Sequence, residues 1–190
     1  MRWLRKVFKG ENRSASGPED TIRFYQQLGF FEGADPVDVV QRYTREHGRA
    51  PRAGKPWDDV FLLAYSEGDV WADDPEADVC AENEVYREVL LEWASISRGA
   101  FVPTGIMEHW GGDAGPVTLT FRLGGQPASV SPGYRDDWID IEVLRQINTL
   151  IAASGRQFEC AEDGNFALVL CLTPDQKKAM QTERDFPFAL

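Results

Sequence analysis

The chain has 190 residues, of which 43% are hydrophobic and 12% aromatic, so it can bury a sizeable core and is not a disordered protein. Its three cysteines and two histidines exclude a disulfide scaffold and a zinc site built from several histidines. With 20 basic and 31 acidic residues the formal net charge is −11, which argues against a nucleic-acid ligand, because phosphate contacts rely on basic surface.

Targeting signals are not evident. No run approaches the roughly 18 apolar residues that a membrane span needs, and the basic start MRWLRKVFKG lacks the apolar stretch of a secretory signal. We therefore expect a cytoplasmic protein with no membrane partner.

The charge is unevenly distributed along the chain. Residues 1–68 hold 11 basic and 10 acidic side chains, whereas residues 69–190 hold 9 and 21. The most acidic stretch, residues 69–92, has nine carboxylates and a single cation, Arg87. Such asymmetry indicates where a charged partner would dock.

Two helices are predicted near the N-terminus. The first covers residues 18–28, with Ile22 and Tyr25 at helical spacing. The second has Asp35 as its N-cap, a proline in the first position, and Gly48 as a C-terminal stop.

A domain boundary is predicted after these helices. Residues 49–56 show no periodicity and are rich in proline, glycine and alanine, which is typical of a linker or a long loop. We therefore expect an N-terminal helical segment over residues 1–56, packed as an annex, and an α+β domain over residues 57–190.

Hairpins are the main pattern of the second domain. Apolar runs at residues 60–65 and 69–72 fit a first hairpin. A second hairpin turns at residues 124–125, which sets Leu119 opposite Val130.

A third hairpin is predicted to turn at residues 163–164. This turn places Cys160 opposite Ala167, and Cys171 four positions further along the partner strand. At about 3.3 Å per residue the two thiols are too far apart for a disulfide or a shared metal ion. All three cysteines, including Cys80, are therefore expected to be free.

Two long helices are predicted to cover the sheet. They span residues 82–98 and 139–154, and the acidic run at residues 136–140 suits the start of the second one. Thr173 is the expected N-cap of a last helix. Because the strands come in hairpins, the predicted fold class is α+β: an antiparallel sheet built from hairpins, packed against two long helices, with an N-terminal helical pair.

Acidic side chains provide the strongest functional signal. Glu84, Glu88 and Glu92 recur every four residues, where like charges cost a few tenths of a kcal/mol per pair. This stripe is either a solvated helix face or, with the acidic loop before it, a surface that steers a basic protein partner. The candidate partner-binding residues are Asp73, Asp74, Glu76, Asp78, Glu84, Glu88 and Glu92.

Catalytic and metal-binding patterns are weak. The acidic loop lacks the spacing and the glycine of a calcium loop, and neither His47 nor His109 has an evident nucleophile. Glu108 cannot orient His109, because adjacent strand residues face opposite ways. We therefore expect no catalytic residue, no metal site, no cofactor and no enzymatic activity.

A resemblance adds to this interpretation. The segments Asp74-Pro75-Glu76-Ala77-Asp78, Glu92-Trp93-Ala94-Ser95-Ile96 and Asp136-Asp137-Trp138-Ile139-Asp140 resemble small bacterial proteins similar to the immunity proteins of polymorphic-toxin and contact-dependent inhibition systems. The resemblance covers residues 70–174 and contains no catalytic motif. It implies a cytoplasmic, acidic, non-enzymatic inhibitor that masks the active site of a basic toxin domain.

Two other classes of function remain open. One is a small-molecule-binding protein or a hydrolytic enzyme with an unrecognised pocket. The other is a structural adaptor that uses aromatic interface anchors, for which the candidates are Trp3, Trp57, Trp71 and Trp110.

Overall fold

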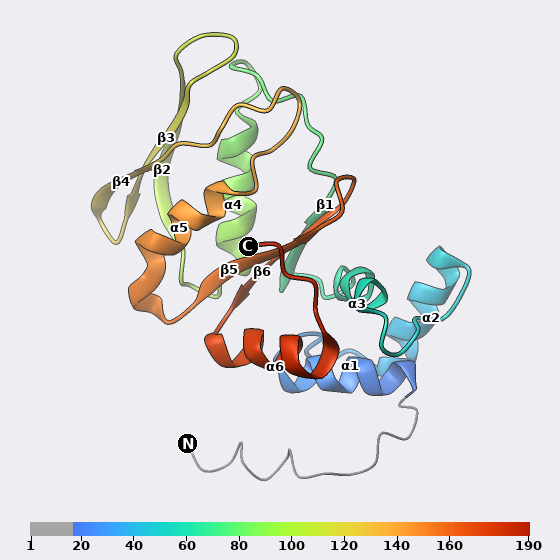
Figure 1. The fold of residues 1–190 in the computed structure, drawn as a ribbon. Helices are drawn as coiled ribbons and strands as arrows, with labels where there is room; N and C mark the ends of the chain where they lie inside the picture. The colour runs from blue at the N-terminus through green and yellow to red at the C-terminus, as the bar shows by residue number, and fades with distance from the viewer. Residues whose placement is uncertain (1–16) are drawn as a thin grey trace. The chain divides into compact units, whose positions relative to one another are not determined.

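The structure of the protein, a computed structural model, describes residues 17–190 (Figure 1). The basic start of the chain and Trp3 lie outside the described residues. The chain divides into two compact units, Met1–Ala53 and Gly54–Leu190.

The first unit contains the two predicted helices, α1 (Pro18–Gln27) and α2 (Pro36–His47), which pack against each other. The Asp35 carboxylate caps α2 by accepting the Val37 N–H at 2.8 Å. Gly48 ends the same helix in the left-handed conformation, with φ of 68°. Both predicted caps are therefore confirmed.

The second unit carries the sheets. Its elements are α3 (Pro56–Leu63), β1 (Val70–Asp73), α4 (Val85–Ile96), β2 (Pro103–Trp110), β3 (Val117–Leu123), β4 (Gln126–Val130), α5 (Val143–Ile151) with the 3-10 turn η2 (Ala152–Ser154), β5 (Gln157–Glu162), β6 (Ala167–Leu172) and α6 (Pro174–Arg184).

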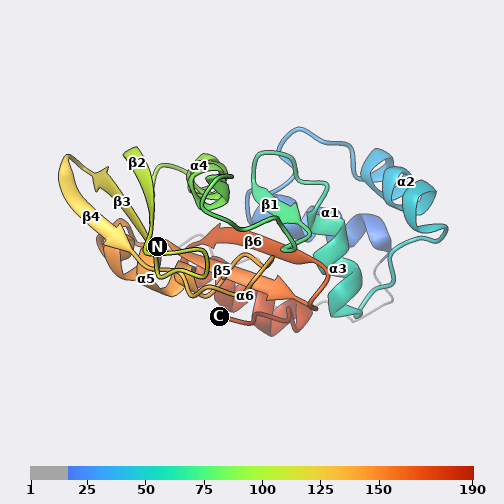
Figure 2. The same ribbon diagram turned by 90° about the horizontal axis from the view of Figure 1, so that it is seen from above.

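The strands form two antiparallel three-stranded sheets, ordered β1-β6-β5 and β2-β3-β4, so the α+β class is confirmed. The prediction of a single sheet is wrong. Helices α4 and α5 lie between the two sheets and contact both (Figures 1 and 2). They have 12 and 9 residues, so each is shorter than the sequence predicted.

The aromatic side chain of Phe101 links the two sheets through the core. The Phe101 ring packs edge-on against Phe121 of β3 at 5.7 Å and against Phe158 of β5 at 6.0 Å. All three rings are buried, and edge-to-face packing of this kind is favourable. The two sheets therefore share one hydrophobic core.

The hairpins differ in how well the sequence predicted them. The β3–β4 register is confirmed, with Leu119 opposite Val130. In the β5–β6 hairpin the prediction is wrong by two positions, because Cys160 lies opposite Val169 and not opposite Ala167. The Asp163 carboxylate accepts the N–H groups of Asn165 and Phe166, which closes a loop of residues 163–166 in place of a two-residue turn.

The first predicted hairpin is also wrong. Residues 60–65 belong to α3 and its end, because Pro56 occupies the first helical position and acidic side chains follow in the first turn. Strand β1 pairs with β6 instead, with Val70 opposite Leu170.

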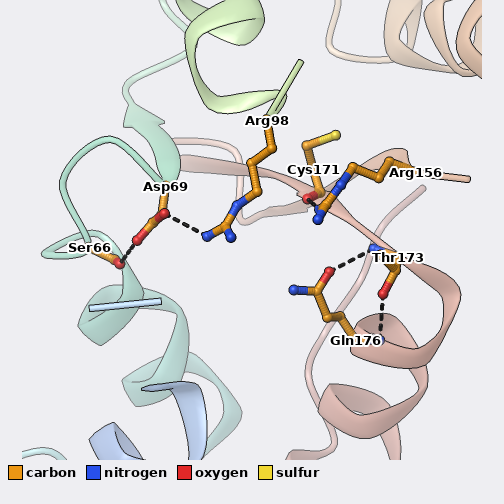
Figure 3. A network of polar contacts seen from close by, with 7 residues as sticks. All are labelled: Ser66, Asp69, Arg98, Arg156, Cys171, Thr173 and Gln176. Carbon is orange, nitrogen blue, oxygen red and sulfur yellow. Dashed lines mark hydrogen bonds and ion pairs between the residues drawn. The ribbon is translucent and has the colours of Figure 1, made fainter. Parts of the chain in front are cut away.

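Polar contacts fasten one end of the β1–β6 pair, where β1 begins and β6 ends (Figure 3). Arg98, which follows α4, donates to the Asp69 carboxylate at 2.6 Å, and Ser66 donates to the same carboxylate at 2.8 Å. Arg156 donates to the Cys171 carbonyl at 3.1 Å. The expected N-cap of α6 is confirmed, since Thr173 and Gln176 form a capping box.

Candidate functional site

The structure pairs the two acidic segments that the sequence analysis treated separately. The Ala77 N–H donates to the Asp137 carbonyl at 2.5 Å, and the Ile139 N–H donates to the Pro75 carbonyl at 2.9 Å. Glu76 therefore lies opposite Trp138 in an antiparallel bridge. We name the pair of segments 75–77 and 137–139 the acidic bridge.

A hollow of about 400 Å³, the acidic hollow, lies beside this bridge. Its lining residues are Asp74, Glu76, Ala77, Asp78 and Asp137. None of these four carboxylates forms an ion pair with any residue in the described part of the chain. Four acidic residues therefore line one small hollow without a compensating ion pair among residues 17–190.

The same acidic side chains also shape the loop that presents them. Asp73 accepts the Asp74 N–H at 2.8 Å, and Asp74 accepts the Glu76 N–H at 2.9 Å. The Asn83 amide donates to the Asp78 carboxylate at 2.8 Å and to the Asp78 carbonyl at 3.0 Å. One oxygen of the Asp74 carboxylate and one of Asp78 thus hold the loop.

A buried carboxylate, Asp140, supports the other half of the bridge. It is 6% exposed and accepts the Gly133 N–H at 2.7 Å. The Arg135 guanidinium lies 3.1 Å from its second oxygen, an ion pair that lacks hydrogen-bond geometry. The Asp140 carboxylate therefore joins the two ends of the loop of residues 133–140.

Helix α4 fixes this loop from the core side. The Asp140 N–H donates to the Tyr86 hydroxyl at 3.0 Å, and Tyr86 is fully buried. Burial raises the pKa of Tyr86 to about 12. The hydrogen bond from the Asp140 N–H acts in the opposite direction, and the nearby charges of Asp140 and Glu108 raise the pKa further. The phenol is therefore a neutral structural group that joins the helix to the loop.

The sequence suggested that the acidic run at residues 136–140 begins a helix, and this prediction is wrong. Helix α5 starts at Val143, after Glu142, and Asp137 lines the acidic hollow. Asp137 is the site residue that the sequence reasoning missed. A signal was present, because Pro132-Gly133 and the lack of apolar periodicity before Val143 are typical of a loop.

The glutamate stripe of α4 has three different roles. Glu84 is the N-cap residue, with φ of 48°, and pairs with Arg87 at 3.3 Å. Glu88 is exposed and forms no ion pair within the described residues. Glu92 accepts the indole N–H of Trp71 at 2.7 Å, which ties α4 to β1.

The seven predicted partner-binding residues are therefore not equivalent. Asp74, Glu76 and Asp78 line the acidic hollow, whereas Asp73 holds the loop backbone. Glu84, Glu88 and Glu92 lie at increasing distance from Asn83, the residue that bonds to Asp78, because the helix rises by about 6 Å over four residues. Asp137 joins the first three at the hollow.

Neither histidine is part of a recognisable catalytic arrangement. The His109 ring lies 3.1 Å from the Thr120 hydroxyl, while Glu108 accepts N–H groups from Arg87 and from the Trp110 indole. His47 stacks on Tyr43 in the last turn of α2. In the region the structure describes, no three histidine, cysteine or carboxylate side chains are grouped to hold a metal ion.

The three cysteines are free thiols, as predicted. Cys160 and Cys171 belong to the hydrophobic core. Burial raises the pKa of Cys160 to about 12 and that of Cys171 to about 11. Two thiols of this kind are packing residues and not nucleophiles.

The tryptophans expected as interface anchors are mostly engaged inside the unit. Trp71 is buried, packs edge-on against Trp93 at 6.0 Å and donates to Glu92. Trp110 packs edge-on against Tyr134 at 5.9 Å. Trp57 is half-buried on α3.

Two further hollows are present in the second unit. One, of about 590 Å³, also adjoins the acidic bridge, and we name it the tryptophan hollow. Its lining includes Pro75, Arg135, Trp138, Glu142, Glu162 and Asp163. The second, of about 680 Å³, lies over the β2-β3-β4 sheet and has Arg122 as its single charged lining residue.

Comparisons with known proteins do not assign the chain to a family. No helix among residues 17–190 combines the length and the apolar composition needed to cross a bilayer. Comparison of the sequence with models of protein families and with curated proteins, and of the fold with solved structures, finds no match.

Proposed function

We propose that this protein is a non-enzymatic binding protein that holds a basic protein partner on the surface around the acidic hollow. The observation that carries the proposal is that Asp74, Glu76, Asp78 and Asp137 line one hollow and form no ion pair among the described residues. Like charges around one hollow repel one another, and a partner's cations relieve this repulsion on binding.

The resemblance to immunity proteins supports a more specific proposal. The partner is a bacterial toxin nuclease, and binding blocks its active site. A nuclease site is basic because it holds phosphates, and carboxylates at the acidic hollow imitate the charge of those phosphates. The exposed Glu88 and the Glu84–Arg87 pair on α4 extend the negative field that steers the partner's approach.

The test uses two versions of the protein as bait in a lysate of the native host. The first is the parent chain, and the second carries D74N, E76Q, D78N and D137N, which keep side-chain size and remove four charges. Mass spectrometry should identify a basic protein that the parent retains and the variant loses. That protein, once purified, should lose its nuclease activity when one equivalent of the parent chain is added. Equal retention by both baits, or full nuclease activity in the complex, would contradict the proposal.

Small-molecule binding is a second candidate, favoured by a different observation. The hollow over the β2-β3-β4 sheet, at about 680 Å³, has the size of a ligand site. It combines the Thr104, Thr120 and Ser129 hydroxyls with the apolar Met107 and Leu150 side chains. A ligand that raises the melting temperature of the parent chain but not of a Thr120→Val variant would support this candidate. A toxin gene directly upstream in the genome would favour the first proposal instead.

A further inference from the structure

The tryptophan hollow combines an apolar floor with an acidic rim. Pro75 and Ile139 are buried at its floor, and Trp138 is half-buried beside them. The exposed Glu162 and Asp163 lie at its rim, in the β5–β6 hairpin. Its volume of about 590 Å³ is in the range of sites that enclose a ligand group.

The charges of the rim are unequally satisfied. The Arg135 guanidinium lies 3.1 Å from the Asp140 carboxylate and 3.4 Å from that of Glu142, so this cation already has two partners. Glu162 and Asp163 form no ion pair with any residue from 17 to 190. One Asp163 oxygen accepts backbone N–H groups of its own loop, and the other is left for a ligand.

This pattern defines the chemistry of a suitable ligand. A long side chain with an apolar stem and a cationic head would bury the stem against Pro75 and Trp138 and place the head at the rim. Arginine fits better than lysine, because its planar guanidinium stacks on an indole and forms bidentate pairs with carboxylates. An uncharged apolar group would leave the rim carboxylates unpaired.

The hollow is also placed where a partner on the acidic surface can reach it. Pro75 and Trp138 line the tryptophan hollow, and their chain neighbours Glu76 and Asp137 line the acidic hollow. The two segments pair with each other in the acidic bridge. The acidic hollow and the tryptophan hollow therefore flank the same two segments. We infer that the tryptophan hollow is the anchor site for one arginine side chain of the basic partner, an inference that rests on the proposed function.

The test uses Nα-acetyl-arginine methylamide as the probe and the ¹⁵N-labelled parent chain. The indole N–H resonance of Trp138, assigned with a W138F variant, should shift in a saturable manner as the probe is added. In an E162Q/D163N variant the apparent Kd should rise about ten-fold, since charge-assisted hydrogen bonds are lost. An E183Q/D185N variant, which neutralises exposed acids of α6 and its C-cap, should titrate like the parent.

Three results would overturn the arginine assignment. The first is no shift of the Trp138 indole resonance, and the second is an equal Kd for the parent and E162Q/D163N. The third is that an uncharged probe, Nα-acetyl-norleucine methylamide, or a lysine probe, Nα-acetyl-lysine methylamide, binds the parent as tightly as the arginine probe does. Failure of the anchor is distinct from failure of the proposed function. If the basic partner still binds through the acidic hollow while Trp138 stays unshifted in the complex, only the anchor is wrong. If the arginine probe binds but D74N/E76Q/D78N/D137N retains the partner fully, the proposed function is wrong.

Discussion

Asn148 of α5 pairs with the backbone of Phe158 in β5 as a neighbouring strand would. Its side-chain amide donates to the Phe158 carbonyl at 2.8 Å and accepts the Phe158 N–H at 2.6 Å. Gln146 does the same for Ser131, just after β4, at 2.8 and 2.9 Å. One helix thus terminates the edges of two sheets with two carboxamides.

The first prediction compares these two pairs. Asn148→Ala should lower the free energy of unfolding by about 2–4 kcal/mol, because two backbone groups at a buried residue lose their partners. Gln146→Ala should lower it by about 1 kcal/mol or less, because Ser131 is exposed and water replaces the amide. Urea unfolding of the three proteins measures the difference, and equal losses would contradict the greater cost assigned to the buried Phe158 backbone groups.

The second prediction separates two acids of the same helical stripe. Glu92→Ala should lower the free energy of unfolding by about 1–2 kcal/mol, since the Trp71 indole N–H loses its acceptor. Glu88→Ala should stay within about 0.5 kcal/mol of the parent, because Glu88 is exposed and forms no ion pair in the described chain. Thermal unfolding is the measurement, and a larger loss for Glu88 would contradict these assignments.

The third prediction concerns association with the proposed basic partner. The quadruple change D74N, E76Q, D78N and D137N should lower the association rate, because it removes long-range attraction to the partner's cations. It should also make the rate depend less on salt, since salt screens such attraction beyond about 8 Å at physiological concentration. Folding stability should be unchanged or slightly higher, since asparagine can accept the loop N–H bonded to Asp74. Stopped-flow mixing at several salt concentrations gives both quantities.

The matched control for association is E183Q/D185N. Both residues are exposed at the end of α6, and asparagine tolerates the left-handed conformation of Asp185, with φ of 50°. This variant should associate at nearly the parent rate. A loss as large as that of the quadruple variant would mean that net charge, and not the acidic hollow, controls the encounter.

The fourth prediction follows from the buried thiols. Folding raises the pKa of Cys160 from 9.0 to about 12 and that of Cys171 to about 11, because burial disfavours the thiolate. Their contribution to stability is complete below pH 9 and is lost as the pH rises through 9 toward these values. Urea unfolding from about pH 8 to about pH 10 should show a steeper decline for the parent than for a Cys160→Ala/Cys171→Ala variant. Parallel curves would contradict the burial of these groups.

The fifth prediction tests a buried ion pair. Glu159 of β5 is 1% exposed, accepts from Gln157 and contacts Lys177 of α6 at 2.5 Å. Lys177→Met should lower the free energy of unfolding by about 3–5 kcal/mol, because it leaves a buried charge without its partner. Glu159→Gln should cost less, since the Lys177 side chain is 22% exposed and can reach water.

A double variant completes this measurement. Glu159→Gln combined with Lys177→Met should recover part of the stability that Lys177→Met loses, which is the signature of a direct interaction. Additive losses would show that the two residues contribute independently. Guanidinium unfolding of the four proteins provides the cycle.

Local chemistry explains most of what the sequence predicted correctly. The caps at Asp35 and Thr173, and the β3–β4 turn at residues 124–125, depend on side chains and glycines within a few residues of each other. The β5–β6 register was wrong because the Asp163 carboxylate closes a longer loop, which the strand pattern does not reveal.

Non-local contacts account for the rest. Val70 pairs with Leu170, a hundred positions away, and no feature of either strand specifies that partner. The acidic hollow depends on a bridge between residues 75–77 and 137–139, so Asp137 could not be joined to Asp74 and Glu76 from spacing alone. The sequence therefore predicted only one of the two segments of the candidate site, because residues 74–78 lie within the acidic stretch 69–92 and Asp137 does not.

The support of the loop at Asp140 has a consequence for the thermodynamics of binding. Its backbone N–H is held by Tyr86 and its carboxylate by Gly133 and Arg135, so residues 133–140 are ordered before any partner arrives. A partner that docks there has little loop entropy to remove, and association can proceed with a small conformational penalty. Calorimetry of the complex should therefore give a heat-capacity change that matches rigid docking and lacks the excess of coupled folding.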